Sequence, residues 1–240
     1  MALRIETFDN VRGGNTLYKA LTHPAAAQQG RALVAALAES GPVAIVDPDG
    51  AAEGFGEIFG LGRVEVAGVF VQNVTRVGAE ALGCRSAPVT ALADCRARTV
   101  LVAGFDADRL IGQLQPYVPA GARALSLDAM RLAPDWLTNP RLYLDPLNFA
   151  TNFAFFRDTG ALHTRLVTAN YWAGYGSADV ACRMMLFDGY GEIIAEWTER
   201  CGPGNAAIII DSREVRARVD LTISLASCFC ISSARPATTS

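Results

Sequence analysis

Short apolar runs alternate with segments of helical periodicity through the first half of the chain. Runs such as VAIVD (43–47) and TVLVAGFD (99–106) are typical of strands buried in a parallel sheet. Leu33, Val34 and Leu37 have the spacing of a helix. Strands are predicted at 43–47, 64–73, 99–106 and 122–128, helices at 24–40, 51–61 and 107–119, and a strand-loop-helix at 88–95. This alternation predicts right-handed βαβ crossovers and strands whose carboxyl ends share one edge.

The pattern changes after about residue 160, where apolar and polar positions alternate. ADVACRMMLFD (178–188), Gly189-Tyr190-Gly191 and EIIAEWTE (192–199) together predict a β-hairpin. The segment NAAIIIDSREVRARV (205–219) begins like a further strand. The second half is therefore expected to be an antiparallel sheet or sandwich.

The predicted fold class is α/β: a Rossmann-like parallel-sheet domain followed by a partial antiparallel β-sandwich. Residues 1–40 are expected to form an N-terminal arm and helix. Residues 41–158 form the Rossmann-like domain with an Asn/Phe-rich connector, and 159–240 form the sandwich-like domain with an irregular tail. The boundary is placed near Asp158.

The tail from about Val219 differs in composition from the strands before it. Its sequence, VDLTISLASCFCISSARPATTS, includes an unusual Cys-Phe-Cys. One hypothesis is a frameshift that truncates the second domain and leaves 219–240 loosely attached, with an unpaired apolar edge after 208–211. The alternative is that 220–232 forms a regular strand that closes the sheet.

Composition narrows the class of protein. The 240 residues are 51% hydrophobic and 19% charged, with a net charge of −3, as in folded globular proteins. This net charge and the absence of Lys/Arg runs argue against nucleic acid and an anionic membrane as partners. No segment resembles a secretory signal or a membrane span, and the six irregularly spaced cysteines suggest reduced thiols rather than a metal site. A cytoplasmic location is expected.

The turn after the first strand, Asp47-Pro48-Asp49-Gly50, is the first candidate site. It has one glycine where the dinucleotide fingerprint has three, and its two carboxylates would repel a pyrophosphate. The second strand ends in Gln72-Asn73, without an acidic ribose ligand. Asp47 and Asp49 are alternatively a site for a cation or sugar hydroxyls, and Asp49 alternatively only caps the next helix.

Asparagine, arginine and aromatic residues are concentrated between Tyr143 and Tyr175. Asn148 and Asn152 are four residues apart and would share a face of a helix, with Arg157 following. The prediction is that these three approach Asp47 and Asp49 in one cleft and bind a carbohydrate or phosphate. The alternative is that the asparagines satisfy backbone groups between the domains.

Two further groups of residues are candidates for ligand binding. His163 and Arg165 lie on one face if their segment is a strand, and His163 is alternatively a structural histidine. Asn170, Tyr171 and Trp172 have the chemistry of a sugar-stacking surface, although half-buried aromatic residues are equally consistent with a core.

Three resemblances bear on function. The layout of residues 41–130 resembles the small Rossmann-like domain of nucleotide-sugar acetyltransferases and is similar to the nucleotide-fold portions of some sugar C-methyltransferases. The strings LDPLNFATNFAFFRD and HTRLVTANYW resemble those of a two-domain family of uncharacterised bacterial proteins. These resemblances imply a domain order and a link to sugars by analogy.

The sequence favours a non-catalytic binding or accessory protein that recognises a sugar, a nucleotide sugar or a protein partner, for example in glycoconjugate assembly. The alternative is an enzyme of nucleotide-sugar metabolism with its site at the strand carboxyl ends. No particular cofactor is predicted.

Overall fold

The computed structural model describes residues 14–137, 139–170, 173–174, 179–190, 192–204, 206–219 and 225–235. For residues 14–15, 135, 147, 150–153, 179, 219 and 225–235 it describes the backbone alone. The chain divides into two compact units, Met1–Leu132 (unit 1) and Ala133–Ser240 (unit 2). The division precedes the boundary expected near Asp158, because residues 150–157 form a strand of the sheet in unit 2.

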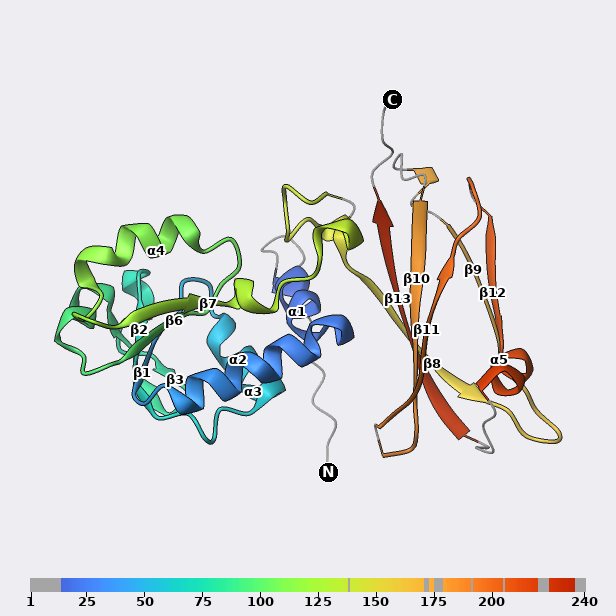
Figure 1. Ribbon diagram of the computed structural model, residues 1–240, viewed down its shortest axis with the longest axis horizontal. Coiled ribbons are helices and arrows are strands. Elements are labelled where there is room, and N and C mark those ends of the chain that lie inside the picture. The colour runs from blue at the N-terminus through green and yellow to red at the C-terminus, as the bar shows by residue number, and fades with distance from the viewer. Residues whose placement is uncertain are drawn as a thin grey trace. The chain divides into compact units, whose positions relative to one another are not determined.

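Unit 1 alternates helices and strands in the predicted order (Figure 1). Its α-helices are α1 (Gly14–Thr22), α2 (Ala27–Glu39), α3 (Ala51–Phe59) and α4 (Asp108–Leu114), and its 3-10 helices include η3 (Val74–Arg76), η4 (Val89–Asp94), η5 (Gln115–Tyr117) and η6 (Leu127–Met130). Its main strands are β1 (Val43–Val46), β2 (Val66–Val71), β5 (Ala87–Pro88), β6 (Thr99–Val102) and β7 (Arg123–Ser126).

The five main strands form one sheet in the order β5-β2-β1-β6-β7, and all of their pairings are parallel. This confirms the predicted parallel sheet and its Rossmann-like class. Written in chain order, the arrangement is 3-2-1-4-5, the order of nucleotide-binding α/β domains. The order reverses between β1 and β6, so their carboxyl ends flank the topological switch point.

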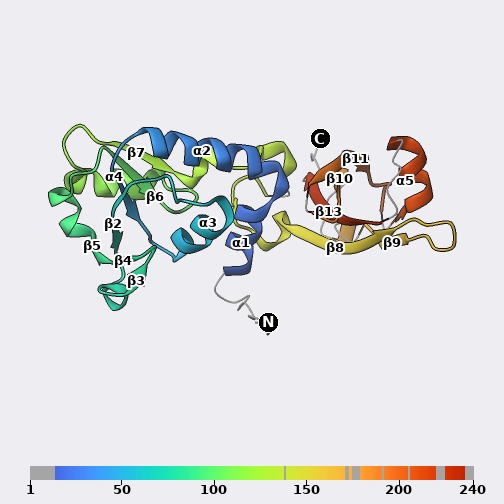
Figure 2. The same ribbon diagram turned by 90° about the horizontal axis from the view of Figure 1, so that it is seen from below.

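Alternating residues of the parallel strands pack on opposite faces of the sheet. Figure 1 shows α4 over one face and α2 and α3 over the other. The α4 side has a continuous buried cluster that includes Ala44, Val46, Val100, Val102 and Leu114. A short antiparallel hairpin, β3 (Glu80–Ala81) with β4 (Cys84–Arg85), projects from the edge of the unit (Figure 2). Both faces of the sheet are thus covered, as a parallel sheet requires.

Unit 2 contains two antiparallel sheets. Its elements are β8 (Ala150–Arg157), β9 (Arg165–Ala169), β10 (Asp179–Phe187), β11 (Ile193–Arg200), β12 (Ala207–Asp211), α5 (Ser212–Val219) and β13 (Leu225–Arg235), with η7 (Pro134–Trp136) and η8 (Pro146–Asn148) before them. One sheet has the order β11-β10-β13-β8, and the other pairs β12 with β9. The predicted hairpin of 178–188 with 192–199 is confirmed as β10 and β11.

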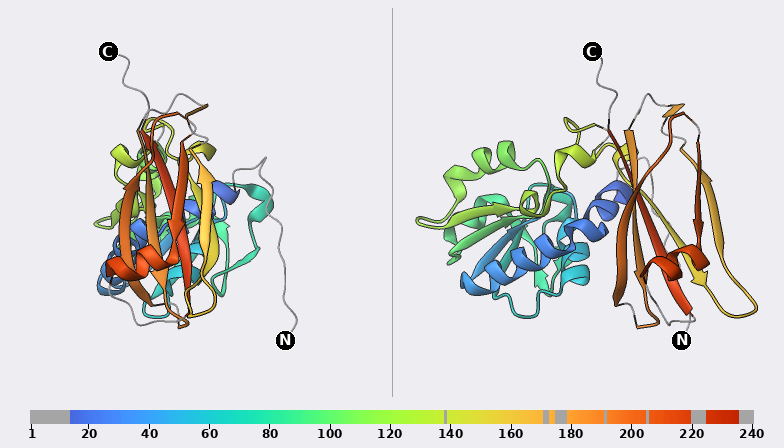
Figure 3. Two further views of the ribbon diagram at one scale, coloured as in Figure 1. Left: turned by 90° about the vertical axis from the view of Figure 1, so that its right-hand side faces the viewer. Right: turned by 45° about the vertical axis from the view of Figure 1, so that its right-hand side comes forward.

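A buried apolar cluster joins the two sheets of unit 2 and α5. The large sheet contributes Phe156, Met184 and Leu186, while Ile210 comes from β12 and Val215 from α5. Figure 3 shows α5 lying at one end of the sheets. The prediction that 205–219 begins as a strand is confirmed by β12, and α5, which follows it directly, was not predicted.

Residues 225–235 form a paired strand. For these residues, the expectation of a loosely attached tail is therefore corrected. β13 pairs antiparallel with β10 on one side and β8 on the other, with Cys230 opposite Met184 and Asn152. The alternative of a regular strand near 220–232 therefore describes this part of the chain better. The frameshift itself stays a prediction.

Within the described ranges, no helix is both long enough and apolar enough to cross a membrane.

Candidate functional site

The carboxyl edge of the parallel sheet in unit 1 is where an α/β domain of this strand order binds its ligands. β1 ends at Val46 and leads through Asp47 into α3, and β6 ends at Val102 and leads through residues 103–107 into α4. The amides at the start of these two helices are the donors that a phosphate group would use. The occupancy of those amides therefore decides what the edge can bind.

Asp47 places its own carboxylate on the first amides of α3. Its Oδ1 accepts hydrogen bonds from the N–H groups of Gly50 (2.9 Å), Ala51 (2.9 Å) and Ala52 (3.4 Å). The residue is fully buried, at 0% exposure. Gly50 permits this turn because its φ is +86°, in the left-handed region. The helix start is thus neutralised from within the chain.

Arg76 completes the buried carboxylate. Its Nη2 lies 2.8 Å from Asp47 Oδ2, and its Nη1 donates to the Asp47 carbonyl oxygen at 3.2 Å. Ser86 Oγ donates to the Arg76 carbonyl oxygen at 2.5 Å and holds this residue in place. The single guanidinium therefore fixes the turn after β1 from a segment that follows β2.

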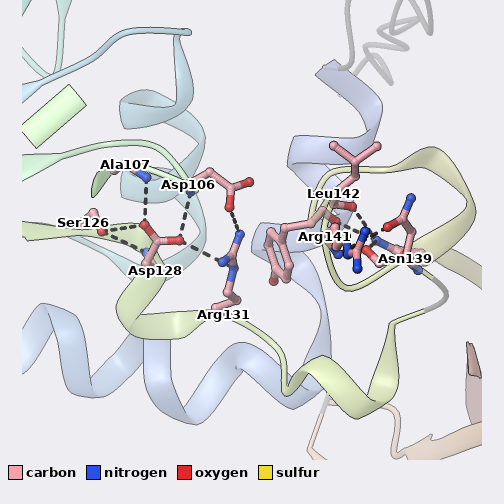
Figure 4. A network of polar contacts seen from close by, with 10 residues as sticks. Asp106, Ala107, Ser126, Asp128, Arg131, Asn139, Arg141 and Leu142 are labelled. Carbon is pink, nitrogen blue, oxygen red and sulfur yellow. Dashed lines mark hydrogen bonds and ion pairs between the residues drawn. The ribbon is translucent and has the colours of Figure 1, made fainter. Parts of the chain in front are cut away.

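Asp128 performs the same task for the turn after β6 (Figure 4). Its two oxygens accept from the N–H groups of Asp106 and Ala107, each at 2.9 Å, and Oδ2 accepts from Ser126 Oγ at 3.0 Å. Arg131 Nε lies 3.6 Å from Asp128 Oδ1, and Arg131 also forms an ion pair with Asp106. Asp106 has a φ of +54°. Both turns beside the switch point therefore carry a carboxylate on their amides and an arginine on that carboxylate.

Asp47 and Asp49 have different roles. The Asp49 side chain is exposed, and the N-cap residue of α3 is Gly50, with Asp47 binding the first amides of the helix. The alternative that Asp49 caps the helix is therefore wrong. Oδ1 of Asp47 accepts from backbone amides and Oδ2 from Arg76. A cation or sugar-hydroxyl site at Asp47 and Asp49 stays a prediction. Among the described residues, no group of three or more His, Cys, Asp or Glu side chains is arranged to hold a metal ion.

Asn148 in unit 2 is 2% exposed and ties together its own loop. Its Nδ2 donates to the carbonyl oxygens of Leu142 (2.8 Å), Tyr143 (3.0 Å) and Asn139 (3.2 Å), and its Oδ1 accepts from the Asn139 amide at 2.8 Å. Figure 4 shows Asn139, Arg141 and Leu142 in this network. Asn148 thus satisfies backbone groups, as the alternative expected, but these groups belong to one loop of unit 2.

Asn152 and Arg157 lie on strand β8, so the helical face proposed for Asn148 and Asn152 is wrong. The Arg157 side chain is exposed, while its N–H donates to Thr164 Oγ1 at 2.9 Å and its carbonyl oxygen accepts from Ser212 Oγ at 3.1 Å. Asp47 and Asp49 belong to unit 1 and the other three to unit 2. A cleft shared by all five stays a prediction.

His163 and Arg165 converge on Asp211 in unit 2. Arg165 Nε lies 3.0 Å from Asp211 Oδ2, and His163 Nε2 lies 3.7 Å from the same oxygen. The pKa of Asp211 is lowered, chiefly because its carboxylate accepts the Arg213 amide; the Arg165 hydrogen bond and the positive charges add to this, and burial opposes it. The Arg165 side chain remains 60% exposed and available to a ligand.

Asn170 is buried at 1% exposure at the end of β9. Its Nδ2 donates to the Gly202 carbonyl oxygen at 3.3 Å, and its backbone N–H donates to the Ala206 carbonyl oxygen at 3.0 Å. Within the described part of the chain, its Oδ1 has no hydrogen-bond partner. Tyr171 and Trp172 lie outside the described residues.

The sequence analysis did not select Arg76, Asp128, Arg131 or Asp211. Asp128 carried a usable signal, since it follows a predicted strand as Asp47 does. Arg76 carried none, because its partner is 29 positions away and arginine is common in the chain.

Comparisons with known proteins yield little. No family model matches the chain, and no curated protein matches it. Among solved structures, the chain is similar to the sugar N-methyltransferase KedS8 from Streptoalloteichus sp ATCC 53650, at 14% identity over 98% of this chain and 99% of that chain, with a TM-score of 0.30. At this score the similarity establishes neither a shared fold nor a shared function.

Proposed function

We propose that the protein is a non-catalytic binding or accessory protein in which unit 1 is a scaffold. The observation that carries this proposal is the Asp47 carboxylate on the first amides of α3. To bind there, a phosphate would have to displace a buried carboxylate that is paired with an arginine, and the two negative charges would repel each other. The nucleotide position of the fold is thereby filled by the chain itself.

The ligand surface in this proposal lies on unit 2, around Arg165 and the outer face of β9 and β12. Val167 and Ile209 are paired across the strands and are 65% and 53% exposed. An exposed apolar pair beside an accessible arginine offers apolar contact and directional hydrogen bonds. The ligand classes are a sugar, the sugar part of a nucleotide sugar, or a protein partner, for example in glycoconjugate assembly.

A second candidate function is an enzyme of nucleotide-sugar metabolism. The observation that favours it is the strand order, which creates a switch point between β1 and β6. The exposed Asp49 and Asp106 lie in the two turns at that edge. This function requires the ligand to avoid the capped amides.

A thermal-shift screen with matched pairs of ligands separates the two functions. The pairs are nucleoside diphosphates with nucleosides, and nucleotide sugars with the corresponding free sugars, with S-adenosylmethionine tested alongside. A ligand at one hundred times its Kd stabilises a folded protein by about 2.7 kcal/mol. The proposal predicts that any rise in Tm survives removal of the phosphates.

Matched arginine variants locate the response. Arg165→Ala is expected to reduce the rise in Tm, and Arg109→Ala, at an exposed position of unit 1, is expected to leave it unchanged. A rise that requires phosphate and persists in Arg165→Ala would favour the enzyme. Turnover of a nucleotide sugar by the purified chain would contradict the non-catalytic proposal directly.

A further inference from the structure

Two cysteine thiols of unit 2 face each other across neighbouring strands. Cys182 lies on β10, and Cys201 directly follows β11. The backbone fixes their relation, because the Cys201 N–H donates to the Val180 carbonyl oxygen at 2.8 Å and Cys182 is paired with Glu199. The two Sγ atoms are 3.5 Å apart. Closing a disulfide, whose S–S bond is about 2.05 Å long, thus requires a movement of about 1.5 Å.

The two thiols differ in access and reactivity. Cys182 is 1% exposed within the apolar cluster of unit 2, whereas Cys201 is half-buried. The pKa of Cys201 is lowered, mainly by its hydrogen bond with Cys182, while burial and the Glu199 charge act in the opposite direction. Since the thiolate is the attacking species, Cys201 is the thiol that meets a reagent first.

We propose that Cys182 and Cys201 form a reversible dithiol–disulfide site whose reaction partner is a low-molecular-weight disulfide. This inference goes beyond the proposed binding function and does not rest on it. The Cys201 thiolate attacks one sulfur of the reagent, whose S–S bond breaks and releases one thiolate. Cys182, after loss of its proton, attacks Cys201 Sγ, forms the intramolecular bond and releases the second thiolate. The protein loses two protons and two electrons, and the reagent is reduced to two thiols.

The bond would fasten the segment after β11 to the centre of the large sheet. Gly202, next to Cys201, is the acceptor for the Asn170 side chain, so the tie lies beside the end of β9. Oxidation would restrict the unfolded chain and is expected to raise the Tm. The site is therefore expected to set the stability of unit 2 according to redox conditions.

Peptide mapping of the full chain after treatment with glutathione disulfide tests the site. The expected result, read by mass spectrometry, is a pair of peptides joined through Cys182 and Cys201. Its mass is about 2 Da less than the sum of the two reduced peptides, and dithiothreitol separates the pair. Cys84, Cys95, Cys228 and Cys230 are internal competitors. A product that joins other cysteines in preference would overturn the proposal.

Single variants resolve the order of attack. In Cys182→Ser the Cys201–glutathione mixed disulfide is expected to accumulate, because the second thiol is absent. Cys182→Ala serves where the hydroxyl disturbs the apolar cluster, with folding checked by circular dichroism. Cys84→Ser is the matched control and is expected to leave the Cys182–Cys201 product unchanged. The assignment would be contradicted if the disulfides that form in the wild type involve only Cys84 or Cys95. It would also be contradicted if neither Cys182 variant forms a mixed disulfide on Cys201.

Discussion

At the scale of single residues, aspartates that accept backbone N–H groups organise the turns and loops of both units. Asp47, Asp128 and Asp211 each accept at least one backbone N–H and each lie beside an arginine. A carboxylate that accepts amide hydrogen bonds satisfies donors that a helix or turn cannot satisfy itself. These aspartates therefore fix local structure, and the exposed polar groups around them are the ones open to ligands.

Replacing Asp47 tests this role. Asp47→Ala removes the cap of α3 and leaves Arg76 without its carboxylate, so it is expected to lower the free energy of unfolding by about 2–3 kcal/mol. Asp49→Ala is the matched control, two positions away and exposed, and is expected to change it by less than about 0.5 kcal/mol. Urea denaturation measures both values. Equal losses in the two variants would contradict the capping role.

The lowered pKa of Asp211 predicts a pH dependence of stability. A carboxyl group with a lowered pKa in the folded state stabilises the fold above the unfolded value of about 3.9 and loses this contribution as the pH falls through the folded value. Asp211→Asn is therefore expected to be less stable than the wild type at pH 7, with a difference that shrinks toward pH 3. Urea midpoints at both pH values, with Asp49→Asn as control, give the measurement. A pH-independent difference would count against the ionised Asp211.

Cysteine alkylation tests the opposite pKa shifts of two thiols. Burial raises the pKa of Cys95, whereas the pKa of Cys201 is lowered by its hydrogen bond with Cys182. Iodoacetamide reacts with the thiolate, so at about pH 7.5 it is expected to modify Cys201 before Cys95. Mass spectrometry of timed samples reads the two rates. Faster loss of the Cys95 thiol would show that access rather than thiolate content controls the reaction.

At the scale of elements, strands buried on both faces were the most predictable. VAIVD and TVLVAGFD are continuous apolar runs because both faces of the parallel sheet are covered, and they form β1 and β6. β8 was missed because its asparagine, threonine and phenylalanine residues do not distinguish a strand from a helix by period alone. α5 was missed because a strand ends at Asp211 and the helix begins at Ser212 without a loop between them.

Two helical glycines are expected to respond oppositely to a methyl group. Gly54 in α3 has only ordinary contact at its Cβ position, 3.9 Å from Leu21 Cδ1, so Gly54→Ala is expected to stabilise the fold by about 0.5–1 kcal/mol through helix propensity. A Cβ at Gly30 in α2 would lie 2.4 Å from the Phe59 ring, so Gly30→Ala is expected to destabilise it by about 1 kcal/mol or more. Thermal unfolding compares the two. Stabilisation by both variants would contradict the close packing of α2 against Phe59.

At the scale of the whole chain, the sequence predicted the site only in part. Asp47 follows a recognisable strand and could be selected from the sequence, but the sequence did not show that Asp47, rather than Asp49, binds the first amides of α3. The answer depended on Arg76 and Asp128, which reach the two turns through the fold from distant segments. Such long-range pairs leave no periodic signal in a single sequence.

The most direct measurement is an NMR titration of the ¹⁵N-labelled full chain. Adenosine diphosphate, uridine diphosphate glucose and S-adenosylmethionine are added in turn while the amide signals of Gly50, Ala51 and Ala52 are followed. Because Asp47 occupies these amides, we predict no saturable change in their chemical shifts with any of the three ligands. A saturable, phosphate-dependent shift of these three signals would contradict the account of unit 1 as a scaffold with a filled nucleotide position.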